Sequence, residues 1–323
     1  MKRKVKIGVI GCSKIAQRLI LPTIHESLHY ELIIVGSSDS NKCKLISEKY
    51  NCQCGSYIDV LNNRDVEAVY VSLPNSLHYY WGKEVLKNGK HLFLEKPFTT
   101  KIEETIELLN FAKLNNVIAK ETISYLYSPV LTQIKNLVRK EIGSIKLITA
   151  NFGIPELDSK DIRYSKELGG GAILDMLIYP LTFVLDYIGE IEEVSSKIKF
   201  HSKYKIDTEG YIHISNQEIN AYLNFGIGLS YNNSITIWGE NGILSASRIF
   251  SRPKDFENKI QIEKNGLLEY VDVPKGNQYS AMLDNFYELI SNNNIEIDED
   301  IIKRNRLITN IYNKAYSDSS YRE

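Results

Sequence analysis

The sequence predicts an α/β domain on a doubly wound parallel sheet, followed by an α+β domain on a large, mostly antiparallel, open sheet. Two observations lead to this prediction. Apolar strand-like runs alternate with helical patterns from residue 4 to residue 121, which is typical of parallel strands joined by helices. Beyond that point short strand-like runs follow one another with short turns, as in an antiparallel sheet. We therefore expect domains at residues 1–121 and 122–323, and two domains suit a chain of 323 residues.

Composition limits the classes of function. The formal net charge is −1, which argues against a protein dedicated to nucleic acid or to anionic membranes. No apolar run approaches the roughly 20 residues of a membrane span. The basic residues 1–4 lead into a strand and a glycine turn, and a signal peptide would instead continue with an apolar core and a cleavage site. We expect a cytoplasmic protein with neither a nucleic-acid nor a membrane partner.

The four cysteines fit reduced cytosolic thiols. Cys52 and Cys54 form a C-x-C pair that lacks the spacing and the histidine partners of a zinc site. No metal site is therefore predicted. The remaining cysteines are Cys12 and Cys43.

The turn after the first strand has the chemistry of a phosphate-binding loop. The apolar run Val5–Ile10 leads into Gly11 and then into a helical pattern, which gives a dinucleotide fingerprint of the form G-x-S-x-x-A. Exposed N–H groups and the dipole at a helix start favour a pyrophosphate. Ser13 stands where a second glycine is usual, and its hydroxyl could donate to a phosphate. A tight βα turn without a ligand is the alternative. The candidate cofactor contacts here are Gly11, Ser13, Lys14, Ile15 and Ala16.

The end of the second strand, Glu31–Gly36, is where the adenine ribose is read in such folds. An acidic side chain directly at this point would accept from both ribose hydroxyls and repel a 2′-phosphate. The hydroxyls of Ser37 and Ser38 and the ammonium of Lys42 tolerate a phosphate, so NADP is favoured over NAD. Asp39, slightly further on, keeps NAD open. Alternatively, residues 37–39 simply cap the helix that begins near residue 41.

Two further strands end in polar residues. In open α/β sheets, ligands bind at the carboxyl ends of the strands. The run 65–73 ends in a Pro-Asn turn, and the run 91–94 ends in Glu-Lys-Pro. His78 is either a first-turn helix residue or a cofactor contact. The alternative for the Glu-Lys pair is a surface position at a strand end without a ligand. The candidate contacts at these ends and at the next strand are Leu73, Pro74, Asn75, His78, Glu95, Lys96 and Glu121.

The second half begins with a helical pattern at residues 130–139 and a strand at 145–152. A polar loop with Arg163 then leads to Gly169-Gly170-Gly171, which opens a helix carrying Asp175 and Tyr179 at i, i+4. The helical patterns 279–290 and 299–316 close the chain. Between the helix with Asp175 and these two closing helices lie the strand-like runs 194–200, 209–214, 219–225, 234–238, 260–263 and 269–273.

Taken in order, these motifs resemble the Gfo/Idh/MocA family of nicotinamide-dependent oxidoreductases over essentially the whole chain. Tyr179 stands where many members have His, which is similar to the branch with dihydrodiol dehydrogenase, glucose-fructose oxidoreductase and the nucleotide-sugar 3-ketoreductases. The resemblance implies a Rossmann domain and hydride transfer between NAD(P) and a carbonyl or secondary alcohol of a sugar or nucleotide-sugar. Two departures are the absence of the Arg that commonly follows Ser37 and the presence of Leu177 where Gly is usual.

The resemblance places Lys96 beside the nicotinamide and the substrate hydroxyl. Reducing a ketone builds negative charge on its oxygen, and that oxygen also needs a proton. We predict Tyr179 as the proton donor or acceptor, with Lys96 polarising the oxygen; the reverse assignment is open. Asp175 would orient the substrate or Lys96, or merely stabilise the helix start. Tyr179 could instead be a packing residue. The candidate substrate contacts are Lys96, Tyr125, Arg163, Asp175 and Tyr179, with Arg163 meeting a phosphate or forming a surface salt bridge.

Two other functions remain open. One is the same chemistry on another small polyol or a dihydrodiol, and the other is a cofactor-binding regulatory protein without turnover. An exposed antiparallel sheet also predicts a homodimer or homotetramer through the C-terminal sheet.

Overall fold

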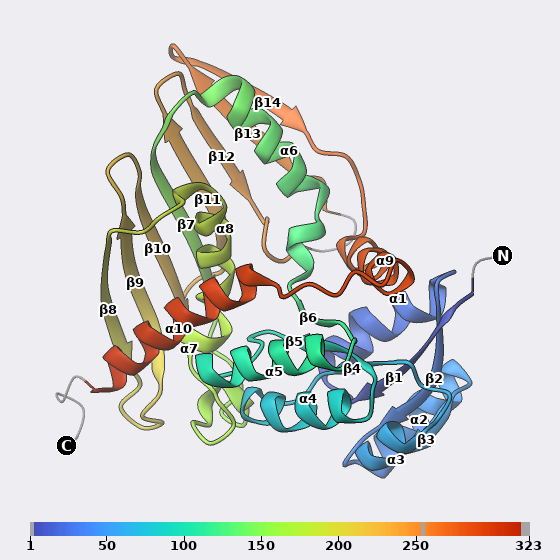
Figure 1. Cartoon of the computed structure of the whole chain (residues 1–323). Coiled ribbons are helices and arrows are strands. Elements are labelled where there is room, and N and C mark those ends of the chain that lie inside the picture. The colour runs from blue at the N-terminus through green and yellow to red at the C-terminus, as the bar shows by residue number, and fades with distance from the viewer. Residues whose placement is uncertain (1–2, 253–255, 318–323) are drawn as a thin grey trace. The chain divides into compact units, whose positions relative to one another are not determined.

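The computed structural model describes residues 3–252 and 256–317, and the chain divides into two compact units (Figure 1). Unit 1 comprises residues 1–124 and 279–305, and unit 2 comprises residues 125–278 and 306–323. The division expected at residue 121 assigned residues 279–305 to the second domain, whereas they group with unit 1. Aromatic packing explains this, because Phe286 stacks on Phe93 with the ring centroids 4.2 Å apart.

Unit 1 is built on sheet A, which has six strands in the described part of the chain, in the order β3-β2-β1-β4-β5-β6. Every strand pair is parallel, which confirms the predicted doubly wound sheet. All four residues of β4 are buried, which explains its uninterrupted apolar sequence. The strands are β1 (Val5–Ile10), β2 (Tyr30–Gly36), β3 (Gln53–Gly55), β4 (Ala68–Val71), β5 (His91–Glu95) and β6 (Ala119–Thr122).

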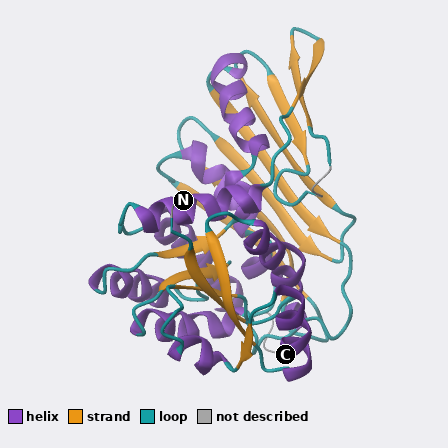
Figure 2. Ribbon diagram, turned by 90° about the vertical axis from the view of Figure 1, so that its right-hand side faces the viewer, coloured by secondary structure: helices purple, strands orange, loops and turns teal. Residues whose placement is uncertain are grey.

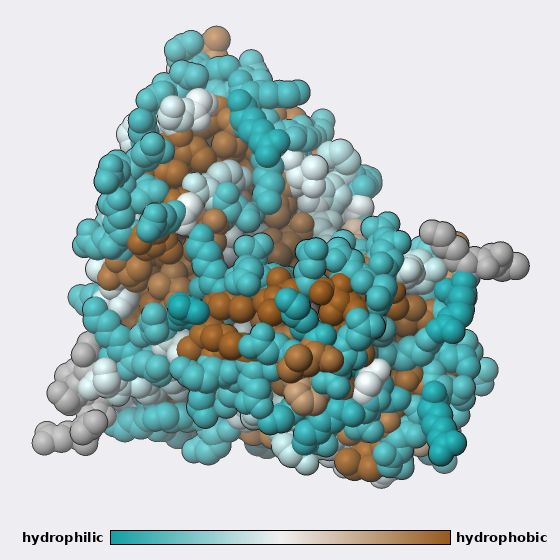
Figure 3. Space-filling model, in the orientation of Figure 1, coloured by the Kyte–Doolittle hydropathy of each residue, from teal (hydrophilic) through white to brown (hydrophobic). Residues whose placement is uncertain are grey.

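Helices cover both faces of sheet A. Figure 3 shows mainly hydrophilic residues over α4 and α5, with apolar residues visible between them. Inside, Gly82 of α4 lies so close to Leu92 and Leu108 that an added Cβ would approach each to 3.2 Å. The helices are α1 (Leu21–Glu26), α2 (Ser40–Tyr50), α3 (Tyr57–Asn62), α4 (His78–Lys87), α5 (Ile102–Leu114), α9 (Gln278–Ser291) and the start of α10 (Glu299–Ser317).

The sequence did not predict β3 and α3. β3 is a three-residue edge strand that is largely exposed, so it carries no hydrophobic alternation. α3 is short, and a capping box starts it: Ser56 Oγ accepts the N–H of Asp59, and Asp59 accepts the N–H of Ser56. The S-x-x-D spacing was therefore the available signal.

The helix after the glycine turn is not regular. Residues 16–20 form a π-helical segment before α1 begins at Leu21. Pro22 explains the irregularity, because it has no N–H to donate to the carbonyl of Arg18 and its ring clashes with a regular turn. A wider turn upstream relieves both problems.

The expectation of four reduced thiols is wrong in part. Cys43 of α2 and Cys54 of β3 form a disulfide, with their Cα atoms 5.7 Å apart. Cys12 and Cys52 are free. Sequence spacing did not reveal the pair, because the two cysteines meet only once α2 packs beside β3.

Unit 2 is built on sheet B, which has eight strands among the described residues, in the order β14-β13-β12-β11-β7-β10-β9-β8. Its pairs are antiparallel except for β7 with β10, which confirms the predicted mostly antiparallel sheet. The strands are β7 (Ile145–Ile154), β8 (Glu193–Phe200), β9 (Asp207–Ser215), β10 (Asn220–Ile227), β11 (Asn232–Gly239), β12 (Ile243–Ser247), β13 (Lys259–Lys264) and β14 (Leu267–Asp272).

β7 enters the middle of sheet B, although it precedes the other strands by some forty residues. It pairs with β10 on one side and β11 on the other, so the β10–β11 turn bridges across it. The prediction also omitted β12, whose run Ile243–Ser247 has only small polar residues between its apolar ones. Strand order of this kind follows from tertiary pairing and is not encoded in local pattern.

In the described part of the chain, helices lie against one face of sheet B, as Figures 1 and 2 show for α6 (Pro129–Leu137) and α8 (Ile178–Ile188). A π-helical segment, Val138–Ile142, extends α6, and α7 (Ala172–Asp175) precedes α8. On the open face Tyr222 is 46% and Trp238 is 55% exposed, beside Leu147. None of the described helices is long and apolar enough to cross a bilayer.

A buried ion pair ties the last strand of sheet A to α10. Arg304 and Glu121 form a salt bridge in which their side chains are 4% and 1% exposed. The second carboxylate oxygen of Glu121 accepts the N–H of Phe98 at 2.5 Å. Breaking such a pair leaves one charge buried without compensation.

We predict that Arg304→Met destabilises the protein by about 3–5 kcal/mol, because the Glu121 carboxylate then stays buried and unpaired. The exposed Arg306, two residues further on, provides the matched control, and Arg306→Met is expected to change stability by no more than about 0.5 kcal/mol. Urea unfolding measures both. Equal unfolding midpoints for the two variants would contradict this role of the pair.

Candidate functional site

The turn after β1 brings the chain close to the end of β4. Gly11 has φ +91°, and a Cβ there would lie 2.3 Å from the carbonyl oxygen of Ser72. Only glycine tolerates both conditions. The Ser13 hydroxyl lies 2.5 Å from the Ser72 hydroxyl and accepts the N–H of Ala16 at 3.0 Å. Ser13 therefore braces the turn, which explains how a serine replaces the usual glycine.

The residues that follow differ in exposure. Lys14 is exposed, Ile15 is half-buried, and Ala16 has no exposed surface. Ala16 thus lets the helix approach the sheet as the fingerprint requires. The first N–H groups of this helix lie at the carboxyl edge of sheet A, where they suit the pyrophosphate of a dinucleotide.

The polar residues after β2 lead directly into α2. Asp39 caps this helix, because its Oδ1 accepts the N–H of Lys42 at 3.0 Å. The Ser37 hydroxyl accepts the N–H of Asp39 at 3.1 Å. The side chains of Ser38 and Lys42 are exposed. The capping alternative therefore accounts for Asp39, while a hydroxyl and an ammonium stay at the surface.

His78, predicted as a cofactor contact or a helix residue, joins two turns. It is fully buried, with Nδ1 2.7 Å from the Pro97 carbonyl oxygen and Nε2 2.9 Å from that of Leu73. Burial lowers the pKa of His78, and the nearby Lys96 ammonium lowers it further. The neutral ring has one N–H, so it donates to one of these two carbonyl groups, one of which follows β4 and the other β5. Pro74 and Asn75, between them, are half-buried.

The Glu-Lys-Pro motif lies at this carboxyl edge of sheet A, and the Lys96–Pro97 peptide is cis. Glu95 accepts hydrogen bonds from the Tyr70 hydroxyl at 2.6 Å and the Thr122 hydroxyl at 2.8 Å, and burial raises its pKa. Lys96 is 7% exposed. An ammonium so shielded from water acts strongly on any charge beside it. Glu121, predicted to contact the cofactor, accepts hydrogen bonds with both carboxylate oxygens, one from the Phe98 N–H and one from Arg304.

In unit 2 the three glycines are required by close contacts. Gly169 and Gly171 have φ +74° and +106°. A Cβ on Gly170 would lie 2.4 Å from the Arg163 carbonyl oxygen, and one on Gly171 would lie 2.2 Å from the Asp207 carboxylate. The turn thus fits between the loop before it and β9, and it fixes where α7 begins.

Asp175 and Tyr179 do not share one helix, so the predicted i, i+4 relation is wrong. α7 ends at Asp175, and α8 begins at Ile178. Pro180 explains the break, because it cannot donate to the Met176 carbonyl, whereas a proline is tolerated in the first turn of a new helix. Leu177, the departure noted in the sequence, is fully buried at this junction.

Asp175 is paired with Arg163, whose Nε donates to Asp175 Oδ2 at 2.6 Å. Arg163 Nη1 also donates to Asp161 Oδ1 at 3.1 Å. Arg163 therefore forms a salt bridge, although the pair is largely shielded and does not lie at the surface as the alternative supposed. Asp161 is a partner that the sequence analysis did not single out.

Tyr179 lies in an aromatic cluster. Its ring meets that of Phe152 edge-on at 4.9 Å, and the rings of Tyr125 and Phe250 lie 6.0 and 6.1 Å away. The Tyr125 hydroxyl donates to the Tyr179 carbonyl at 3.2 Å, and Tyr125 is fully buried. Packing thus holds the Tyr179 ring, which itself stays half-buried.

The sequence analysis also missed Asp207, which is buried at the start of α7. Its Oδ2 accepts the N–H of Ile173 at 2.5 Å, and its Oδ1 accepts the Tyr316 hydroxyl at 2.8 Å. Burial raises the pKa of Asp207 to about 6. Asp207 and Tyr316 stand in no recognisable motif, because they come from β9 and α10 and meet only in the folded protein.

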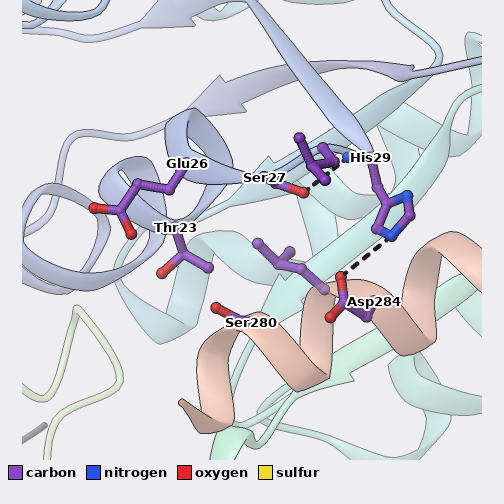
Figure 4. Close-up of a pocket in the computed structure, with 8 residues that line it drawn as sticks. Thr23, Glu26, Ser27, His29, Ser280 and Asp284 are labelled. Atoms are coloured by element: carbon purple, nitrogen blue, oxygen red, sulfur yellow. Dashed lines mark hydrogen bonds and ion pairs between the residues drawn. The ribbon is translucent and has the colours of Figure 1, made fainter. Parts of the chain in front are cut away.

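A pocket of about 300 Å³ in unit 1 is lined by none of the candidate residues. Figure 4 shows it between the end of α1 and α9, with His29 directed at Asp284, 3.8 Å away. The pocket is lined by residues that immediately precede β2, so it lies at the amino edge of sheet A. Among the described residues, no group of three or more His, Cys, Asp or Glu side chains is placed to hold a metal ion.

A Rossmann sheet with a glycine turn, a buried lysine at a strand end and a second unit on an open sheet define a dinucleotide-binding oxidoreductase of two units. Residues 5–122 match an oxidoreductase family with an NAD-binding Rossmann fold, and residues 131–245 match the GFO/IDH/MocA C-terminal domain. The chain belongs to the Gfo/Idh/MocA family, as its motifs predicted, and it is a nicotinamide-dependent oxidoreductase.

Relatives cover most of its length. dTDP-3,4-didehydro-2,6-dideoxy-α-D-glucose 3-reductase of Streptomyces violaceoruber is 31% identical over 89% of this chain and 86% of its own. The enzyme of the same name from Saccharopolyspora spinosa is 30% identical over 86% and 85%.

Among solved structures, a 3-ketoreductase from Actinomadura kijaniata in complex with NADP and TDP-benzene superposes with a TM-score of 0.92, at 28% identity over 95% of this chain and 96% of that one. Further structures of that protein carry a tyrosine-to-phenylalanine or a lysine-to-alanine substitution.

The acidity of Asp207 predicts a pH dependence of stability. Its folded pKa of about 6 lies above the ordinary value of about 4, so folding takes up a proton between these pH values. This contribution to stability is therefore complete below pH ~4 and is lost as the pH rises through ~6. Asp207→Asn should remove it, so melting temperatures of the two proteins should diverge from pH 4 to 7. A constant difference would contradict the assignment.

Proposed function

We propose that this protein uses NADPH to reduce a ketone on the deoxysugar of a nucleotide-sugar. The observation that carries the proposal is its match, over nearly the whole chain, to 3-reductases named for such a substrate. The structure with NADP and TDP-benzene supports both the cofactor and the nucleotide. The end of β2 agrees with NADPH, because Asp39 is engaged in capping and Lys42 is exposed.

The cofactor half of the proposed site uses the residues at the carboxyl edge of sheet A. The turn at Gly11 and the N–H groups after it would hold the pyrophosphate. Ser37, Ser38 and Lys42 would receive the 2′-phosphate, and the Pro74–Asn75 turn would bound the nicotinamide. When bound, the nicotinamide supplies the hydride.

The chemical step needs a group that stabilises the developing oxyanion and a group that gives it a proton. We assign the first role to Lys96, whose low exposure strengthens its field. We assign the second to Tyr179, whose ring is held by Phe152 and Tyr125. The lysine and tyrosine substitutions made in the 3-ketoreductase support a lysine and a tyrosine as the residues to test. Asp175 would hold a substrate hydroxyl.

We further propose that the protein self-associates through the open face of sheet B. On this face Tyr222 stacks on His213, and Trp238 pairs across from Leu147. Exposed aromatic residues on a flat sheet are typical of a protein interface. The cytoplasmic location and the absence of other partners stay predictions.

Lys96→Met should lower the rate of NADPH oxidation with dTDP-3,4-didehydro-2,6-dideoxy-α-D-glucose by about 100-fold or more, because an oxyanion stabiliser contributes on that order. Tyr179→Phe should lower it by about 100-fold and change its pH profile, since the proton donor is lost. Stopped-flow absorbance at 340 nm measures both rates, with NADPH affinity measured by fluorescence. The exposed Lys101→Met serves as the control.

The pH profiles decide between the two assignments. A basic limb that disappears in Tyr179→Phe identifies the tyrosine as the acid, whereas one that disappears only in Lys96→Met identifies the lysine. Wild-type turnover that persists within twofold in both variants would overturn the proposed chemistry. NADPH binding without turnover would favour a regulatory protein.

Trp238→Lys and Tyr222→Lys should each weaken self-association, because a buried ammonium replaces an aromatic contact at the proposed interface. Light scattering after size exclusion measures the mass of each variant. Leu114→Lys, at an exposed position of α5, is the matched control and should leave the mass unchanged. A wild-type protein that is monomeric at micromolar concentration would end this proposal.

A further inference from the structure

Arg163 contacts both ends of α7, the start through its backbone and the end through its side chain. Its guanidinium donates to Asp175 at 2.6 Å and to Asp161 at 3.1 Å. Its carbonyl oxygen accepts the N–H of Gly171 at 2.9 Å, and its own N–H donates to Asp161. Because the backbone contact fixes where Arg163 sits relative to the glycine turn, the guanidinium meets Asp175 at one defined place.

The Arg163–Asp175 pair is shielded from water. The side chains are 29% and 13% exposed, and Asp175 is the main cause of a raised Arg163 pKa. A charge-assisted hydrogen bond of this length at low exposure is stronger than an ordinary surface pair. Two ionisable groups near the glycine turn, Asp207 of β9 and Tyr316 of α10, bond to each other.

The charges around Arg163 argue against a phosphate here. Its guanidinium already donates to the carboxylates of Asp161 and Asp175, which would repel an incoming phosphate and which that phosphate would have to displace. A neutral sugar hydroxyl could instead donate to a carboxylate oxygen. This differs from the phosphate contact that the sequence suggested for Arg163.

We infer that Arg163 is a positioning residue, which holds Asp175 ionised and oriented to accept a hydrogen bond from a hydroxyl of the substrate's sugar ring. The inference rests on the proposed function, because it takes Asp175 as a substrate contact. The Arg163–Asp175 pair would also contribute to substrate specificity, because this part of the site would bind a sugar hydroxyl while other residues bind the diphosphate.

Binding of thymidine diphosphate alone tests the charge argument. Calorimetry on the full-length protein with NADP present should give affinities within about twofold for wild type and Arg163→Met, since a phosphate ligand would be worth more than that. A loss of tenfold or more in Arg163→Met, with a weaker salt dependence, would make Arg163 a phosphate ligand and overturn the inference.

Kinetics with the same dTDP-ketosugar test positioning. Arg163→Met should lower kcat/KM by about tenfold or more, the scale of one charge-assisted hydrogen bond. The acid limb of the pH profile of kcat/KM for Arg163→Met should move to higher pH, because the Asp175 carboxylate binds a proton more readily without the guanidinium beside it. Arg163→Lys should restore part of both effects. Asp161→Asn leaves the Arg163–Asp175 bond in place and should keep the acid limb where it is.

The double variant Arg163→Met/Asp175→Asn separates positioning from general loss of structure. If Arg163 acts through Asp175, the double variant should be no slower than Asp175→Asn alone. If instead the losses of kcat/KM in the two single variants multiply in the double variant, and the acid limb of the Arg163→Met pH profile does not move, Arg163 has an independent structural role. That result would end the inference. Failure of the proposed function is distinct, because wild type would then not oxidise NADPH with the ketosugar, while the thymidine diphosphate titration would still report on Arg163.

Discussion

The hydrogen bonds of His78, Glu95 and Glu121 at the carboxyl edge of sheet A support everything proposed for the cofactor half of the site. His78 contacts the turns after β4 and β5, Glu95 is held by Tyr70 and Thr122, and Glu121 joins Phe98 to Arg304. Each side chain is ionisable and shielded from water, so the loss of its hydrogen-bond partner would lower the stability of the protein. Because their partners lie on neighbouring strands and on α10, the loop that carries Lys96 cannot move without breaking several of these bonds together.

The result is an ammonium with little access to water. Lys96 is 7% exposed and lies near a histidine whose pKa is lowered. Such a charge needs a rigid polar surrounding to remain buried, and the same rigidity preorganises it for a developing negative charge. In this protein the stability of the edge and its proposed chemistry therefore have the same origin. In unit 2, Asp207 and Arg163 likewise hold α7, the first at its start and the second at its end.

Much of the fold could be predicted from local sequence pattern, because long apolar runs and glycine turns report burial and backbone directly. The six parallel strands, apart from β3, and the Gly11 turn follow from such patterns. Proline was the signal that was undervalued. Pro22 widens the first helix, and Pro180 separates Asp175 from Tyr179, and both effects follow from a missing N–H.

The remaining differences depend on contacts between distant residues. His78 was expected near a cofactor, yet its ring nitrogens lie beside two carbonyl groups, one of them 19 residues away in sequence. Asp207, Tyr316 and Arg304 stand in no motif, and Cys43 meets Cys54 only after α2 docks. Residue type and spacing can identify which side chains carry chemistry, but the partner of each is decided by the packing of elements that local pattern does not order.

The most direct test of hydride transfer by this protein follows the hydrogen itself. NADPH deuterated on the reactive face of C4 is incubated with the full-length protein and dTDP-3,4-didehydro-2,6-dideoxy-α-D-glucose, and the nucleotide-sugar is analysed by mass spectrometry and NMR. The account predicts that deuterium appears on the sugar carbon that bore the ketone, and that Lys96→Met abolishes the transfer while still binding NADPH. Bound cofactor with no deuterium in this sugar, or in any ketosugar of a panel, would contradict it.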